Sequence, residues 1–346
     1  MKYLILQNPG HNRVYYNLAD QLALAELQIA AEKMQSEVST VEVELIEGVR
    51  YLSLETTELL TDSDLEIVSR LSFVFAIFQQ EEDSNCLKPI RKNEYEFVDQ
   101  KISSLLKYHG KTNELFTKMM VNVGLLASDF NHNETITLLD PVAGKGTTLY
   151  EALVYGFDAY GIEMETGAVH EAATFFKKYL ETEKFKHNAD ERRIAGTNKN
   201  NEIQIRDFEF AKTKEAFKSG EGIKRIGMIT GNAAEAYTYF KKPKFNLIVG
   251  DLPYGIYHGN KSFESRSGAT RNPSELLEEC LPQWMKVLKK GGTIVLAWNS
   301  FVVSPKKLSE IFESNGFSVL KEGPYTKFQH MVDKSIKRDI IVAKKV

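Results

Sequence analysis

The chain has 346 residues, enough for two domains, and its 42% apolar and 26% charged residues are ordinary for a soluble globular protein. A net charge of −3 gives no overall electrostatic sign of nucleic-acid binding, and no apolar run approaches the roughly 18–20 residues that a membrane span needs. The first residues lack the pattern of a secretory signal, and Cys86, Cys280 and seven scattered histidines show no metal-ligand spacing. We therefore expect a cytoplasmic protein that binds neither a membrane nor a metal.

Residues 1–105 predict a small α/β unit of their own. Period-two apolar patterns indicate strands at 2–6, 41–46, 50–55 and 72–78, and helical patterns cover 15–33 and 63–69. Elements that alternate in so short a segment are typical of a ferredoxin-like sandwich.

Residues 106–346 predict a larger domain with a mostly parallel sheet. A helix is expected after a cap at Thr112 or Asn113. Strands are then expected at 136–139, 159–162, 226–229, 245–249, 293–297, 317–320 and 339–343, with helices at 147–155, 165–183, 274–288 and 305–314. An insert at about 185–223 separates the second of these strands from the third. In such sheets, ligands bind at the carboxyl ends of the strands.

The stretch LLDPVAGKGTTLYEAL, residues 138–153, indicates a cofactor turn. Asp140 ends a strand, and Gly144 and Gly146 allow a ligand to approach the backbone closely. A nicotinamide-binding turn would carry a third glycine where this chain has Leu149. An acid in the turn would repel a pyrophosphate and favour a cationic cofactor. S-adenosyl-L-methionine (SAM), with its ammonium and sulfonium groups, is such a cofactor.

Polar residues also end the next two predicted strands. Glu163 is placed to hold a ribose diol, and the amide of Asn232 could receive an adenine amino group. Together with Asp140 they describe a nucleoside pocket. The alternative is that Glu163 and Asn232 are only helix caps.

The stretch DLPYG, residues 251–255, follows a buried strand and suits methylation of an exocyclic amine on a base. The Asp251 carboxylate and the Leu252 carbonyl could accept hydrogen bonds from the two N–H groups of the amine, and Pro253 would fix the direction of that carbonyl. Tyr254 offers a face for stacking an extruded base. The alternative is a β-turn with proline and glycine in ordinary turn roles.

Taken together, GKTN, DPVAGKGT, GIE, GN and DLPYG resemble the Rossmann-fold amino-methyltransferases, above all the THUMP-associated tRNA guanosine-N2 methyltransferases and their bacterial relatives. The resemblance covers about residues 105–346 and implies a sheet whose last strand is antiparallel. It implies an amino-group site at residues 251–254, and SAM contacts at Lys111, Thr112, Asn113, Asp140, Ala143, Gly144, Gly146, Thr147, Glu163, Asn232 and Asp251.

The chain departs from the family pattern in three places. Leu252 stands where many members have proline, and Asn232 stands where aspartate is common. Residues 1–105 look like the family's ferredoxin-like recognition domain but are too few to hold a full THUMP domain as well. The insert at 185–223 is a candidate to compensate for its absence. Residues 184–225 also carry eleven Lys/Arg against seven Asp/Glu, and solvated loop charge is the alternative interpretation of this excess.

The sequence thus predicts a SAM-dependent methyltransferase that acts on guanosine N2 in RNA, with tRNA as the expected partner. Adenine N6 methylation of DNA or another RNA, a SAM-binding scaffold without turnover, and a nicotinamide oxidoreductase are the alternatives. The hairpin before the last strand should lie beside the catalytic turn, where Lys334, Lys337 or Arg338 would contact substrate phosphate. Ordinary surface charge is the competing interpretation of that hairpin.

Overall fold

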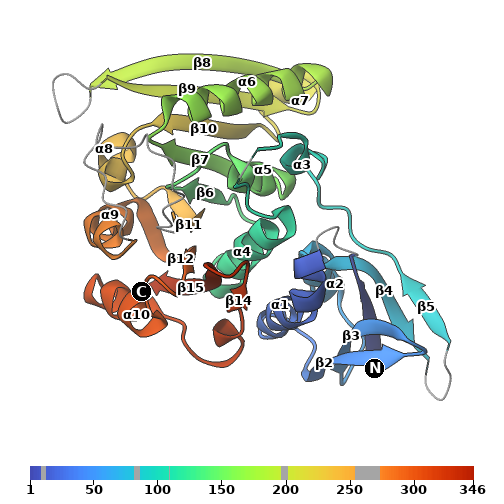
Figure 1. The fold of residues 1–346 in the computed structure, drawn as a ribbon. Helices are drawn as coiled ribbons and strands as arrows, with labels where there is room; N and C mark the ends of the chain where they lie inside the picture. The colour runs from blue at the N-terminus through green and yellow to red at the C-terminus, as the bar shows by residue number, and fades with distance from the viewer. Residues whose placement is uncertain (9–12, 82–85, 109, 196–201, 254–272) are drawn as a thin grey trace.

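The computed structural model describes residues 1–8, 13–81, 86–108, 110–195, 202–253 and 273–346. Its elements form two sheets, one of five strands and one of ten (Figure 1). Among the described residues, no helix combines the length and apolar character needed to cross a membrane.

The five-stranded sheet is built from the N-terminal residues and has the order β2-β3-β1-β4-β5, with every neighbouring pair antiparallel. The chain order β1, α1, β2, β3, α2, β4 with this strand order is the predicted ferredoxin-like arrangement, and β5 adds an edge strand. The bounds are β1 Lys2–Gln7, α1 Arg13–Ala31, β2 Val38–Ile46, β3 Val49–Thr56, α2 Asp62–Arg70, β4 Val74–Gln80 and β5 Leu87–Ile90.

The larger sheet has the order β13-β15-β12-β11-β6-β7-β10-β9-β8, and β14 pairs with β15. Strands β10, β7, β6, β11 and β12 are parallel, and β15 lies antiparallel between β12 and β13. This order confirms the predicted Rossmann-like methyltransferase sheet with a reversed last strand. The bounds are β6 Thr137–Asp140, β7 Asp158–Glu163, β10 Lys224–Thr230, β11 Phe245–Asp251, β12 Leu288–Asn299, β13 Phe317–Val319, β14 His330–Met331 and β15 Lys337–Lys345.

The insert extends this sheet rather than forming a separate unit. It supplies β8 Lys186–Ala195, β9 Glu202–Ala211 and the short helix α7 Lys214–Ser219, and β9 pairs antiparallel with β10. Phe208 and Phe210 of β9 enter the core on one face of the sheet, and Ile203 and Ile205 enter the core on the other. Strand β9 therefore contributes one half to each of the two cores.

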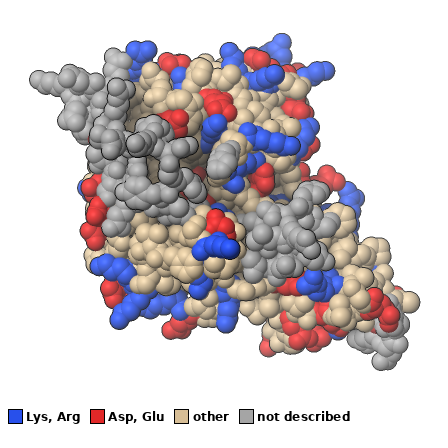
Figure 2. All heavy atoms as spheres, viewed as in Figure 1, with Lys and Arg blue, Asp and Glu red and all other residues tan. Residues whose placement is uncertain are grey.

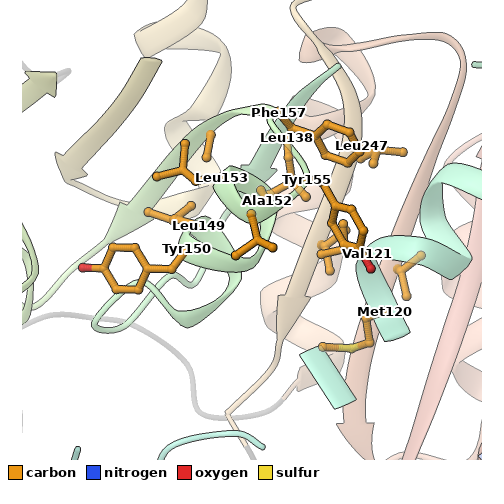
Figure 3. Packing of buried hydrophobic residues seen from close by; sticks show 14 of the residues in the cluster. Met120, Val121, Leu138, Leu149, Tyr150, Ala152, Leu153, Tyr155, Phe157 and Leu247 are labelled. Atoms are coloured by element: carbon orange, nitrogen blue, oxygen red, sulfur yellow. The ribbon is translucent and has the colours of Figure 1, made fainter. Parts of the chain in front are cut away.

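Helices cover both faces of the larger sheet. One core contains α4 Glu114–Ala127, α5 Thr147–Val154 and α6 Thr166–Thr182, and the opposite core contains α8 Ala236–Phe240, α9 Pro273–Val287 and α10 Pro305–Ser314. Figure 3 shows Ala152 of α5 and Val121 of α4 among the residues packed with Leu138 and Leu247 of the sheet. In the described ranges, the remaining helices are α3 Ile102–Leu105 and two 3₁₀ turns, Ala233–Glu235 and Gly323–Thr326.

Helix α1 joins the two parts of the chain because it is apolar on two sides. Ala23 and Leu27 pack into the core of the small sheet, whereas Leu22, Ala25 and Ile29 belong to the same core as α4. A helix that is apolar on both sides has to be buried between two layers. The domain boundary near residue 105 stays a prediction, since the two parts share this hydrophobic cluster.

Candidate active site

The carboxyl ends of the parallel strands bring the predicted residues to one edge of the larger sheet. Asp140 ends β6 beside Gly161 of β7, Glu163 ends β7 beside Thr230 of β10, and Asp251 ends β11 on the other side of β6. This is the edge at which parallel α/β sheets bind their ligands.

The side chain of Glu163 holds the glycine turn, residues 143–146, by a hydrogen bond. The Gly144 amide donates to Oε2 of Glu163 (2.9 Å), and the Glu165 amide donates to Oε1 (2.9 Å). Gly144 and Gly146 both have positive φ, at 51° and 90°, and Gly146 caps α5, so other residues would strain this turn. The N-cap of α6 is Glu165. Glu163 is therefore a brace for the turn and not the cap of the next helix.

The structure explains why the third glycine of a nicotinamide turn is dispensable here. A Cβ on Gly161 of β7 would lie 2.7 Å from Cβ of Ala143 and 2.8 Å from a methyl of Leu149. The close approach of helix and strand is thus provided by a glycine on the strand. Ala143 also donates its amide to the Ile162 carbonyl (3.0 Å), which fixes the turn over β7.

Asp140 is an almost fully buried carboxyl, 3% exposed. Burial raises its pKa to about 7, and the nearby charges of Glu163 and Asp251 act in the same direction, whereas hydrogen bonds from Thr148 and the Val142 amide oppose them. Near neutral pH such a carboxyl is partly protonated, and a cation bound beside it would favour the ionised form.

Asn232 begins the 3₁₀ turn after β10. Its side-chain oxygen accepts from the Ala234 backbone N–H (3.0 Å), and the backbone N–H of Asn232 donates to the Tyr239 hydroxyl (2.9 Å). The capping role considered for this residue is thus present. An oxygen has a second lone pair, so the cap still leaves Asn232 as a candidate acceptor for an amino group.

Two residues from distant parts of the chain meet one oxygen of Asp251. The Thr112 hydroxyl donates to Oδ2 at 2.6 Å, and a guanidinium nitrogen of Arg338 lies 3.6 Å from the same atom. The Arg338 guanidinium also lies over the Phe116 ring, 4.9 Å from its centroid, and the side chain is buried. These contacts hold the carboxylate in a defined orientation beside the glycine turn.

Of the three predicted site residues in the loop before α4, residues 111–113, two make contacts within the loop and helix and one contacts Asp251. Asn113 is the N-cap of α4 and accepts from the Phe116 amide (3.1 Å). Lys111 pairs with Glu114 (2.5 Å) and donates to the Ser103 carbonyl. Within residues 111–113, the hydrogen bond to Asp251 therefore comes from Thr112.

Tyr108 is a candidate site residue that the sequence analysis missed. Its hydroxyl lies 2.9 Å from Oγ1 of Thr147, the first residue of α5, and the Lys145 ammonium lies 5.1 Å from its ring centroid. Burial raises the pKa of Tyr108, and the charges of Asp140 and Asp251 contribute to the increase. Its place just before GKTN, where an aromatic side chain follows a helical segment, was the available sign.

The structure describes the predicted catalytic turn up to Pro253. The Leu252 amide donates to the Ala297 carbonyl of β12 (2.9 Å), and its side chain is buried. Pro253 is exposed. Tyr254 lies outside the described residues.

The hairpin of β14 and β15 lies beside Asp251 of the predicted catalytic turn. Arg338 is 5% exposed and faces Asp251, whereas Lys334 is exposed and Lys337 is half-buried. Lys334 and Lys337 are thus the more accessible candidates for a phosphate contact. On the face shown in Figure 2, the basic and acidic side chains of the described residues are interspersed.

No metal centre is apparent in the part of the chain that the structure describes, where no group of three or more His, Cys, Asp or Glu side chains could hold an ion.

No protein-family model matches the chain, and no curated protein matches it. Solved structures of similar fold include TrmN from Thermus thermophilus, at 13% identity and a TM-score of 0.40, with the match covering 90% of this chain and 60% of TrmN. An rRNA methylase from Streptococcus thermophilus has 10% identity and a TM-score of 0.33, covering 61% of this chain and 87% of that one. A TehB-like SAM-dependent methyltransferase from Corynebacterium glutamicum has 14% identity and a TM-score of 0.34, covering 62% and 82%. At these identities and TM-scores, the likeness assigns no activity to the chain.

Proposed function

We propose that this protein is a cytoplasmic SAM-dependent methyltransferase that modifies an exocyclic amine of a nucleobase in RNA, with guanosine N2 of tRNA as the first candidate. The observation that carries the proposal is the position of Asp251. Its carboxylate ends the strand next to β6 and is held by Thr112 (2.6 Å), at the same edge as the glycine turn. The proposed amine acceptor is thus adjacent to the candidate nucleoside pocket.

The residues of the glycine turn suit SAM. A Cβ on Gly144 would meet no atom within 4 Å beyond its chain neighbours, so a ligand can approach the backbone there. Glu163 is half-buried at the end of β7, where it could hold a ribose. The buried Asp140 would gain a cationic partner, which relieves the cost of an ionised carboxylate in the interior. When bound, SAM supplies an electrophilic methyl group.

The catalytic turn would then position the nucleophile. The amine lone pair of a base is conjugated with the ring, so acceptors for its N–H bonds help the nitrogen to pyramidalise. Asp251 and the Leu252 carbonyl are assigned this role, and Tyr254 is assigned the stacking of the extruded base. Residues 1–105 are assigned to substrate recognition, and Lys334 and Lys337 to phosphate contacts.

Mass spectrometry of nucleosides tests this proposal most broadly. RNA and DNA from cells with and without the protein would be digested, and purified protein would be given SAM and nucleic acid from the cells that lack it. We expect N2-methylguanosine to disappear from tRNA in those cells and to return in vitro. N6-methyladenine as the missing product would favour the alternative substrate, and SAM binding without methyl transfer would favour a scaffold.

A further inference from the structure

A cavity of about 340 Å³ lies between the N-terminal unit and α4. We propose that it binds a nucleobase of the RNA substrate that flanks the methylated nucleotide, an inference that rests on the proposed function. Its walls are mostly apolar and come from both parts of the chain, including Leu22, Ala23, Phe73, Leu115, Phe116 and Met119. Pockets for small ligands are commonly about 300–1,000 Å³ and frequent where domains meet, so a single base suits the lower end of that range.

The position of the cavity links it to the candidate active site. Phe116 forms part of its wall, and the ring of the same residue carries the Arg338 guanidinium at 4.9 Å. Arg338 in turn lies 3.6 Å from Asp251. Phe116 and Arg338 therefore connect the cavity wall to the proposed amine acceptor. An RNA strand whose target base lies at Asp251 could place a neighbouring base in the cavity.

The polar groups of the cavity suit the edge of a base. Gln7 lines the cavity, and its side-chain amide donates to Asp20 (2.6 Å), which fixes which end of the amide is the oxygen. That oxygen is buried, and the described residues provide no hydrogen-bond partner for it. A buried acceptor without a partner is costly, and an N–H group on a ring edge would satisfy it once the cavity opens to the ligand.

The wall also carries a charged pair that suits a nucleotide rather than a purely apolar ligand. Arg50 lies 2.7 Å from Asp20, and the Arg50 side chain is 41% exposed. A half-exposed arginine can contact a phosphate while the base is held between apolar side chains. Aromatic and apolar walls of this kind recognise single-stranded segments, whose bases are free to leave the stack.

Filling the cavity tests the proposal. Ala19 of α1 is half-buried and lines the cavity, so Ala19→Trp would place a large ring inside it. Ala31→Trp is the matched control, because Ala31 is half-buried on the same helix and does not line the cavity. Both variants would be compared with wild type for SAM affinity, for melting temperature, and for kcat and KM with bulk RNA from cells lacking the protein.

We expect Ala19→Trp to raise KM for RNA at least tenfold while SAM affinity stays within twofold of wild type, and Ala31→Trp to leave both unchanged. Equal KM values for the two variants, with normal methyl transfer by wild type, would overturn the cavity proposal and leave the proposed function intact. If wild type transfers no methyl group to RNA although it binds SAM, the proposed function fails and the cavity assignment fails with it.

Photo-crosslinking provides a readout that does not depend on a variant. Wild-type protein would be irradiated with the same RNA carrying 4-thiouridine and 6-thioguanosine, and the crosslinked peptides would be mapped. Crosslinks to Phe73, Phe116 or Met119 from a nucleotide adjacent to the methylated one support the proposal. Crosslinks confined to other surfaces, with methyl transfer intact, would overturn it.

Discussion

The Thr112 hydroxyl donates a 2.6 Å hydrogen bond to Oδ2 of Asp251, across 139 positions of sequence. It ties the loop before α4 to the end of β11. A hydrogen bond to a charged group contributes about 1.5–3 kcal/mol, because the ionised partner strengthens it. We therefore regard Thr112 as the residue that positions the proposed amine acceptor.

Replacing Thr112 by valine should slow methyl transfer, because the Asp251 carboxylate would lose one restraint. If the whole contribution of this hydrogen bond, about 1.5–3 kcal/mol, is lost from the transition state, the rate falls by roughly ten- to a hundred-fold. Thr112→Ser keeps the hydroxyl and is expected to retain most of the activity. Single-turnover rates of the two variants check this. Equal rates for valine and serine would show that the hydrogen bond has no part in positioning.

SAM should bind, and NADH should not. The glycine turn lacks a third glycine at Leu149 and carries the buried Asp140. Glu163→Ala removes both the proposed ribose contact and the brace of the Gly144 amide, so we expect SAM affinity to fall by about 1.5–3 kcal/mol. Glu163→Gln keeps an acceptor for that amide and should lose less. Isothermal titration measures SAM and NADH binding to the wild type and SAM binding to both variants, and NADH binding without SAM binding would contradict this account.

SAM affinity should depend on pH through Asp140. Its pKa is raised to about 7 from 3.8, mainly by burial, so the carboxyl is largely protonated below pH 7. A cationic ligand prefers the ionised form, and affinity should therefore fall by up to about tenfold per pH unit as the pH drops below 7. The free energy of unfolding of the SAM-free protein depends on pH in the opposite direction from the affinity. The folded form binds the proton more tightly, so this group's contribution to stability is lost as pH rises through about 7.

Asp140→Asn provides the control for that pH dependence. The amide does not titrate, so its SAM affinity should be low and nearly constant between pH 6 and pH 8. A wild-type affinity that is also constant over this range would show that Asp140 does not meet the cationic part of the ligand.

Charge in the β14–β15 hairpin should act in two different ways. Lys334 is exposed, so Lys334→Ala should weaken RNA binding and reduce its logarithmic salt slope by about 0.7–0.9. Arg338 is buried against Asp251, so Arg338→Met should reduce turnover and leave the salt slope unchanged. Filter binding at several salt concentrations distinguishes them. A reduced slope for Arg338→Met alone would show that the buried arginine reaches a phosphate.

Most of the fold could be predicted because the apolar periods of its strands and helices are clear. Helix α10, expected at 305–314, is found at Pro305–Ser314. Of the two strands of the insert, β8 was missed for a physical reason. Strand β8 is an edge strand whose sequence, KHNADERRIA, is largely charged, and edge strands commonly carry charges that prevent further pairing.

The candidate site could be predicted less completely than the fold. Asp140, Glu163 and Asp251 were foreseeable because each ends a strand, and the ends of parallel strands share one edge. The meeting of Arg338 with Asp251 depends on the register of β15 against β12, where Arg338 pairs with Asn299. Local sequence does not determine that register, and it does not show that α1 brings a cavity wall next to Phe116.

The central claim is that Asp251 acts on the amine during methyl transfer, and the most direct measurement is the single-turnover rate of Asp251→Ala with tRNA, alongside SAM affinity and melting temperature. Interactions made mainly in the transition state affect turnover rather than ground-state binding. By analogy with a lost oxyanion-hole donor, we expect a loss of about 2.7–4 kcal/mol, a rate roughly a hundred- to a thousand-fold lower, with SAM affinity nearly unchanged. A near-normal rate, or a rate that falls only in proportion to a lower melting temperature, would make DLPYG a structural turn and contradict the account.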